Sequence, residues 1–128
     1  MKKLLLILAV VGVTAAAALA AGDNHVKVAL EPVGGSGVTG MVDLKQLKEG
    51  GTDIHVHASG LTPGTTYASF YYDGRNCENG PDLIGDYTAN ADGRGHVKGT
   101  AEDDLDEIAS VSVRSPDYSV LYACANVH

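Results

Sequence analysis

His55 and His57 stand one residue apart in an alternating apolar segment, and they are the side chains of this sequence best suited to bind a metal. Residues two apart in a β-strand point to the same face, so both imidazoles are expected on one side of the strand. Imidazole nitrogens suit copper and zinc, and two at this spacing can share one ion. The pair predicts a candidate copper or zinc site. The alternative is two solvated histidines on the exterior of a sheet.

Two further histidines follow the same pattern. His96 precedes Val97 and His25 precedes Val26, in segments that also alternate. If the valines point inward, both histidines point outward, as the first pair does. Four of the five histidines are then expected on a sheet exterior. No carboxylate or thiolate at a fixed spacing completes a zinc-type ligand set, so the metal prediction rests on imidazoles alone.

Other segments that could carry chemistry favour structural roles. The acidic run at residues 102–107 lacks the alternating Asp spacing and the Gly of a calcium loop, so it predicts a solvated acidic loop. Ser36 stands between two glycines without the spacing of a nucleophile elbow. The Gly-rich stretches join strand to strand, which does not make a phosphate-binding loop. The sequence therefore predicts no catalytic residue, and no cofactor other than copper or zinc at the histidines.

The elements that must position these residues are short strands. Apolar-alternating runs are separated by turn residues every eight to twelve positions, a spacing typical of all-β sandwiches and barrels. This predicts an eight-stranded antiparallel Greek-key β-sandwich or barrel. The expected strands cover residues 26–30, 38–44, 54–58, 67–72, 84–89, 96–101, 108–114 and 119–127.

The first twenty residues predict an export signal. Met1-Lys2-Lys3 is followed by an apolar stretch and then by Ala18-Leu19-Ala20, the three parts of a secretory signal peptide. A membrane anchor is the alternative, but a spanning helix needs about 20 strongly apolar residues and this stretch is shorter. We therefore expect residues 1–20 to be removed and residues 21–128 to form a single domain. The pattern favours a bacterial protein of the periplasm or the surrounding medium.

The net charge of the expected mature chain disfavours some classes of binding partner. Loss of Lys2 and Lys3 leaves seven basic residues against 16 acidic ones, a net charge of −9. A chain this acidic repels nucleic acid and anionic lipid, so we expect neither as a partner, and no stable membrane insertion after the signal is removed. The expected partner is another exported protein or a small ligand.

The two cysteines, Cys77 and Cys124, both lie in the expected exported part. Two thiols in an oxidising compartment usually pair, which predicts an intramolecular disulfide. A metal site is the alternative, but Cys77 has no nearby Cys or His in the sequence, and Cys124 has only His128. Neither set completes a zinc-type cluster.

Segments in order along most of the expected domain resemble copper/zinc superoxide dismutases. Gly60-Leu61-Thr62-Pro63-Gly64, the strand after it, Gly74 and Cys77 are similar to that family's central turn, metal strand and disulfide loop. Ile84-Gly85-Asp86 and Ala91-Asp92-Gly93 are similar to its zinc-aspartate segment and the hairpin that follows. Leu121-Tyr122-Ala123-Cys124 is similar to its last strand. The resemblance implies a dismutase-like scaffold. It also implies that the strand carrying His55 lies beside the strand carrying His96.

The departures from that family concern its active site. Ser69-Phe70-Tyr71 stands where the resemblance implies a copper-binding His-x-His pair, and Arg114 stands near the place of another copper histidine. The segment between Cys77 and Asp86 is short and has no histidine, and only Asp86 keeps a ligand-type residue. The long electrostatic loop is reduced to four residues, and Val120 replaces the arginine that meets superoxide. The dismutase site is therefore predicted to be absent.

Three functions remain as hypotheses. The first is a non-catalytic exported binding or structural module, because a fold alone does not specify function. The second is a periplasmic protein that handles copper or zinc through its outward histidines His55, His57 and His96. The third is a residual dismutase, which the missing imidazoles disfavour.

Overall fold

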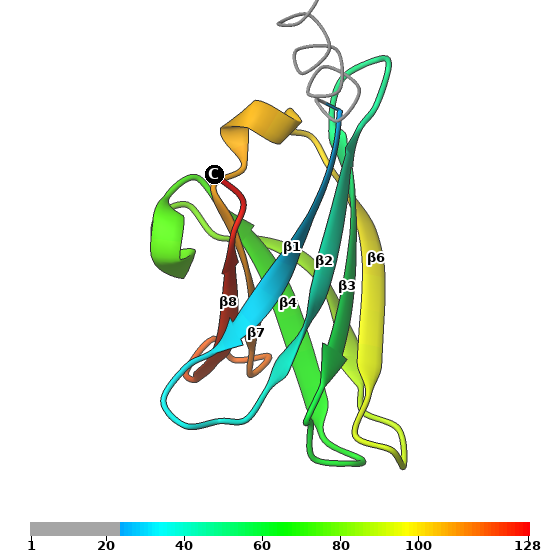
Figure 1. Cartoon of the computed structure of the whole chain (residues 1–128), viewed down its shortest axis with the longest axis vertical. Coiled ribbons are helices and arrows are strands. Elements are labelled where there is room, and N and C mark those ends of the chain that lie inside the picture. The colour runs from blue at the N-terminus through cyan, green and yellow to red at the C-terminus, as the bar shows by residue number, and fades with distance from the viewer. Residues whose placement is uncertain (1–23) are drawn as a thin grey trace, which may run out of the picture.

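The structure is a computed structural model, and it describes residues 24–128. This part of the chain is all-β, and every predicted strand is found (Figure 1). The predicted signal peptide at residues 1–20 lies outside the described residues. Among the described residues, no helix is long and apolar enough to cross a membrane. The strands are β1 (His25–Pro32), β2 (Thr39–Gln46), β3 (Thr52–Ser59), β4 (Thr66–Tyr72), β5 (Asp82–Thr88), β6 (Gly95–Ala101), β7 (Ser110–Arg114) and β8 (Leu121–Asn126).

All strand pairings are antiparallel, in the order β5-β4-β7-β8-β1-β2-β3-β6. The sheet folds over so that β1, β2, β3 and β6 lie across the core from β4, β7 and β8 (Figure 1). The predicted antiparallel β-sandwich or barrel is confirmed, and so is the expected contact between the strands of His55 and His96. The Greek-key part of the prediction stays a prediction.

The two end strands, β5 and β6, come together through packing of side chains on glycines. A Cβ on Gly85 would lie 2.7 Å from a Val97 methyl, and a Cβ on Gly99 would lie 3.0 Å from an Ile84 methyl. The register of β5 against β4 shifts at Ile84, so this residue forms a bulge. Glycine at these positions is what allows the strands to approach and the barrel to close.

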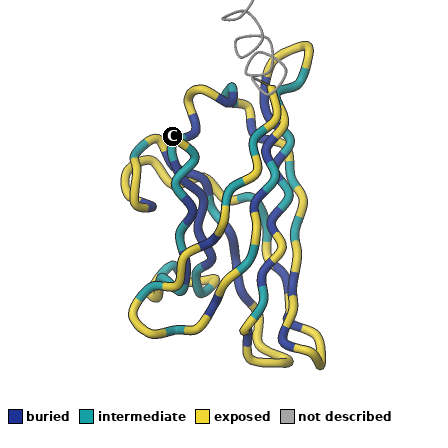
Figure 2. Tube along the Cα trace, in the orientation of Figure 1, coloured by how far each residue is buried: buried dark blue, intermediate teal, exposed yellow. Residues whose placement is uncertain are grey.

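The core follows the period-two alternation of the strands. In β3, Ile54, Val56 and Ala58 are buried and the residues between them are not. Figure 2 shows this alternation along β2 and β3, whereas dark blue is nearly continuous through β4 and β7. Strands β4 and β7 are therefore covered on both faces.

The predicted disulfide between Cys77 and Cys124 is confirmed, with the cysteines 47 positions apart in sequence and their Cα atoms 6.0 Å apart. It ties a 3₁₀ turn, η1 (Arg75–Cys77), to β8 on the outside of the second group of strands. Ser110 at the start of β7 supports the same turn, because its hydroxyl accepts from the Cys77 backbone N–H and donates to the Gly74 carbonyl.

The acidic run folds as a short ordered turn. It contains a 3₁₀ turn, η2 (Leu105–Glu107), and Leu105 is buried. Asp104 Oδ1 accepts hydrogen bonds from the Gly51 backbone N–H and from the Gln46 side chain, both at 2.9 Å. Glu102, Asp106 and Glu107 are exposed, in agreement with the predicted solvated acidic loop, and the Asp104 carboxylate anchors the loop to the turn between β2 and β3.

Candidate metal centre

Strand β3 carries two of the three predicted metal residues on its outer face. Ile54 and Val56 are fully buried, so the intervening His55 and the following His57 point away from the core. His57 is exposed and His55 is partly covered by its neighbours. Their ring centroids lie 4.0 Å apart, with the planes tilted by 38°. The predicted shared face is therefore confirmed.

Strand β6 brings the third imidazole to the same place. His96 is the direct cross-strand partner of His57, and its side chain is exposed. Its ring centroid lies 5.8 Å from that of His55 and 6.1 Å from that of His57. The structure thus gathers the three predicted residues, which are up to 41 positions apart in sequence, into one cluster. We call His55, His57 and His96 the histidine cluster.

The spacing of the histidine cluster suits a shared ion. Imidazole nitrogens bind zinc at about 2.0 Å, which places the ring centroids of two ligands about 5–6 Å apart. The His55–His96 distance of 5.8 Å falls in this range, the His57–His96 distance of 6.1 Å lies just above it, and the His55–His57 distance of 4.0 Å is shorter. Among residues 24–128, three ligand atoms lie within 4.8 Å of one another only in the acidic turn, so the imidazoles must rotate before their nitrogens converge. Exposed side chains change rotamer readily.

The electrostatics of the cluster favour neutral imidazole at His55. Partial burial lowers the pKa of His55, and the nearby His57, His96 and Lys98 lower it further, while Asp43 acts in the opposite direction. Lys98 and Asp43 are the cross-strand partners of His55 on its two sides. Because a metal binds the deprotonated ring, a lowered pKa keeps His55 ready as a ligand.

The end of the barrel next to the cluster is held by backbone hydrogen bonds. The turn after β3 and the hairpin between β5 and β6 are joined by the Leu61 N–H donating to Gly93 O and the Gly64 N–H donating to Ala89 O. These bonds fix the end of β6 against the end of β3. A cleft of about 230 Å³ opens there beside His57 and His96, and Asn90 and Arg94 line its other side.

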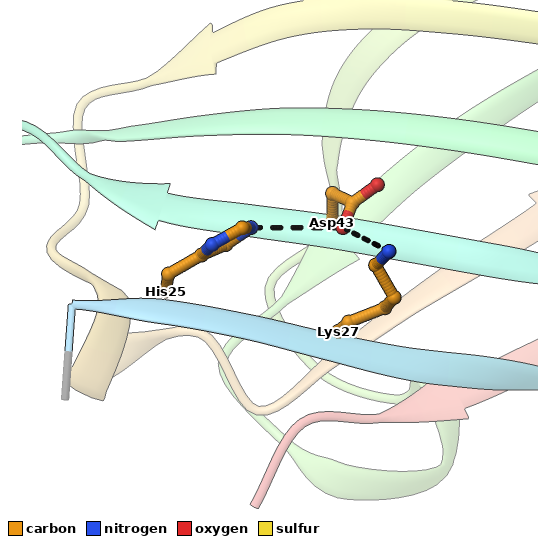
Figure 3. A network of polar contacts seen from close by, with 3 residues as sticks. All are labelled: His25, Lys27 and Asp43. Carbon is orange, nitrogen blue, oxygen red and sulfur yellow. Dashed lines mark ion pairs between the residues drawn. The ribbon is translucent and has the colours of Figure 1, made fainter. Parts of the chain in front are cut away.

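His25, the fourth outward histidine, meets a carboxylate. Its Nε2 lies 3.6 Å from Asp43 Oδ1, and Lys27 Nζ lies 3.8 Å from the same oxygen (Figure 3). His25 shares the outer face as predicted, but its partner is Asp43 and it lies opposite Lys45 in the register.

Asp43 is a residue of this face that the sequence prediction did not include. Its Oδ1 is buried and has no hydrogen-bond partner, although it takes part in both ion pairs. The signal was available, since the flanking Val42 and Leu44 are apolar and place Asp43 outward. Asp43 lies between His25 and the histidine cluster, which it borders through its cross-strand partner His55.

The outer face of the second group of strands carries no imidazole among the described residues. Arg114 lies 3.8 Å from the Tyr118 ring centroid and donates to Tyr72 Oη. Phe70 packs edge-on against Tyr118 with centroids 5.1 Å apart. Ser69 points into the barrel, where its hydroxyl lies 2.8 Å from Tyr87 Oη. Burial raises the pKa of Tyr87 to about 12.

The acidic turn brings Asp104, Asp106 and Glu107 close enough to hold an ion, but its carboxylates already have partners. Asp104 accepts from Gly51 and Gln46, and these hydrogen bonds lower its pKa. Glu107 accepts from the Asp104 backbone N–H in a capping box. The turn therefore serves the fold.

No family model matches this chain, and no curated protein matches it. The resemblance to copper/zinc superoxide dismutases stays a prediction.

Proposed function

We propose that this chain is an exported, non-catalytic binding protein whose ligand is a copper or zinc ion held by His55, His57 and His96. The observation that carries the proposal is the clustering of the three rings, with centroids 4.0, 5.8 and 6.1 Å apart. Nitrogen ligands from imidazole suit both metals. The export signal in the sequence supports an address outside the cytoplasm, and the disulfide is compatible with it.

The exposure of the site supports exchange of the ion more than storage. His57 and His96 are exposed, and the side chains lie on a sheet face. Water and the ligands of a partner protein can reach an ion held by exposed side chains directly. Such a site releases an ion to a better-enclosed acceptor, so we propose that the protein accepts and passes on metal.

The arrangement on the other face supports the non-catalytic part of the proposal. Phe70, Tyr72 and Arg114 fill the outer side of β4 and β7. Ser69 and Tyr71, which stand where the dismutase resemblance implied a copper-binding pair, face the interior of the barrel. Copper cycling requires imidazoles in a fixed geometry. We expect the metal-loaded protein to show no superoxide dismutation above that of the free metal.

The test is a titration of metal-free protein with Cu²⁺ and with Zn²⁺, in which binding is measured by isothermal titration calorimetry or by competition with a chromogenic chelator. The wild-type protein is compared with the His55→Ala/His57→Ala variant. The double variant is expected to lose at least about tenfold in affinity for both ions, because two of three ligands are removed. His25→Ala is the matched control, since His25 lies on the same face but contacts Asp43.

Two outcomes decide the proposal. Retained binding by His25→Ala with loss in the double variant supports it. Equal binding by wild type and the double variant overturns it, and the histidines then serve only to keep the sheet face soluble.

A further inference from the structure

Met41 is an exposed thioether beside the histidine cluster. Its side chain is 38% exposed, and it is one of three large apolar residues among residues 24–128 that are exposed to this extent. It lies in β2 between Gly40 and the fully buried Val42, so it points to the outer face.

The register places Met41 directly against the cluster. Met41 is the cross-strand partner of His57 in β2 and β3, and His57 is the cross-strand partner of His96 in β3 and β6. The three residues form one row across the outer face, with His57 in the middle. Directly opposed side chains have Cβ atoms about 5 Å apart, and diagonal neighbours such as Met41 and His55 about 7–8 Å apart. A thioether on three rotatable bonds reaches across both distances.

The chemistry of this row points to one oxidation state of one metal. Thioether sulfur is a soft ligand that favours Cu(I), and imidazole is also a copper ligand. Zinc sites are built from thiolate, imidazole and carboxylate, so a thioether adds nothing to zinc binding. We propose that Met41 is the fourth ligand of the histidine cluster and that the ion the site takes is Cu(I). This rests on the proposed function, because it assigns the ion and a ligand of the same site.

The charges around the cluster agree with a monovalent ion. Lys98 lies opposite His55, Lys27 pairs with Asp43, and Arg94 lines the adjoining cleft. Among the described residues, Asp43 is the only carboxylate that is a cross-strand partner of a residue of the cluster, and Lys27 and His25 already contact it. Repulsion by the basic groups is proportional to the charge of the ion, so Cu⁺ experiences half the repulsion that Zn²⁺ does.

Few sulfur atoms of the expected processed protein are available to bind a metal. The chain has two methionines, and the other is Met1, in the predicted signal peptide. Both cysteines are in the disulfide. Any thioether or thiol bound to copper in the processed protein must therefore belong to Met41.

The experiment compares wild type with Met41→Leu, expressed from the full-length sequence and handled without oxygen. Cu(I) affinity is measured by competition with bicinchoninate, and Zn²⁺ affinity by calorimetry. Met41→Leu is expected to weaken Cu(I) binding by at least about tenfold and to change Zn²⁺ binding by less than about twofold, because only Cu(I) uses the sulfur. Copper-edge X-ray absorption is expected to show a sulfur neighbour in wild type and none in the variant.

The variant keeps its volume and its exposed position, so its thermal unfolding should match that of wild type. Equal Cu(I) affinity of Met41→Leu and wild type, or the absence of a sulfur neighbour in wild type, overturns the proposal. The proposed function fails separately, when the His55→Ala/His57→Ala variant binds both ions as wild type does.

Discussion

The two outer faces of this barrel are built in opposite ways. The face of β1, β2, β3 and β6 is open, with alternating buried and accessible residues and a histidine cluster on its surface. The face of β4 and β7 lies beneath loops, and β7 is buried at Ser110, Val111, Ser112 and Val113. The imidazoles of the histidine cluster on the open face are accessible to a ligand. Polar side chains on the covered face, such as Ser110 and Arg114, hydrogen-bond to the loops that cover it.

The covering of the second face depends on named contacts. The disulfide fastens η1 over β8, and the Asn76 backbone N–H donates to Asn126 Oδ1 at 2.7 Å. On the other side, Asp117 Oδ1 accepts from Ser119 and from Ser115, and these hydrogen bonds lower the pKa of Asp117 to about 2. Substitutions on the covered face should therefore change stability, whereas substitutions on the open face should change ligand binding.

The largest expected effect is on the covered face, from removing the disulfide. Cys77→Ser/Cys124→Ser is expected to lower the free energy of unfolding by about 4 kcal/mol, because the bond closes a long loop and restricts the unfolded chain. Urea denaturation followed by tyrosine fluorescence measures it, since the chain has no tryptophan. Reduction of wild type should produce the same loss. A loss below about 1 kcal/mol would show that the loop stays in place without its bond.

A smaller effect is expected from Arg114→Ala. The substitution removes stacking on Tyr118 and the hydrogen bonds to Tyr72 Oη and the Tyr118 carbonyl, which together stabilise the fold by about 2 kcal/mol. Lys98→Ala on the open face is the control, and it should cost less than about 0.5 kcal/mol. Similar losses in the two variants would contradict the difference between the faces.

The smallest expected effect on stability comes from the histidine cluster itself. In metal-free buffer, His55→Ala/His57→Ala should unfold within about 0.5 kcal/mol of wild type, because the replaced side chains lie outside the core. With copper at about 100 times the wild-type dissociation constant, wild type should gain about 2.7 kcal/mol, and the variant, which binds at least about tenfold more weakly, should gain about 1.4 kcal/mol or less. Thermal denaturation with and without metal measures both. A large loss in metal-free buffer would place the histidines among the structural residues.

Much of the fold was predictable because it depends on local alternation. An alternating run such as Ile54, Val56 and Ala58 predicts both that a strand is present and which of its faces is buried. The ends of the strands were less predictable. The last expected strand began at residue 119, but β8 begins at Leu121, because Tyr118 has a φ of 70° and Asp117 binds Ser119 in the preceding turn. The 3₁₀ turn at Arg75–Cys77 was also missed, since it is held by distant Ser110 and Asn126.

The sequence by itself determined which way the histidines face, because side-chain direction in a strand repeats every two residues and the apolar partners must be buried. Only the tertiary structure decided which residues lie beside them. Met41, His57 and His96 come from three strands, and their alignment in one row depends on the register of two separate pairings. The turns and the hydrogen-bond ladders set that register, and shifting either pairing by two residues would keep every face and disperse the row.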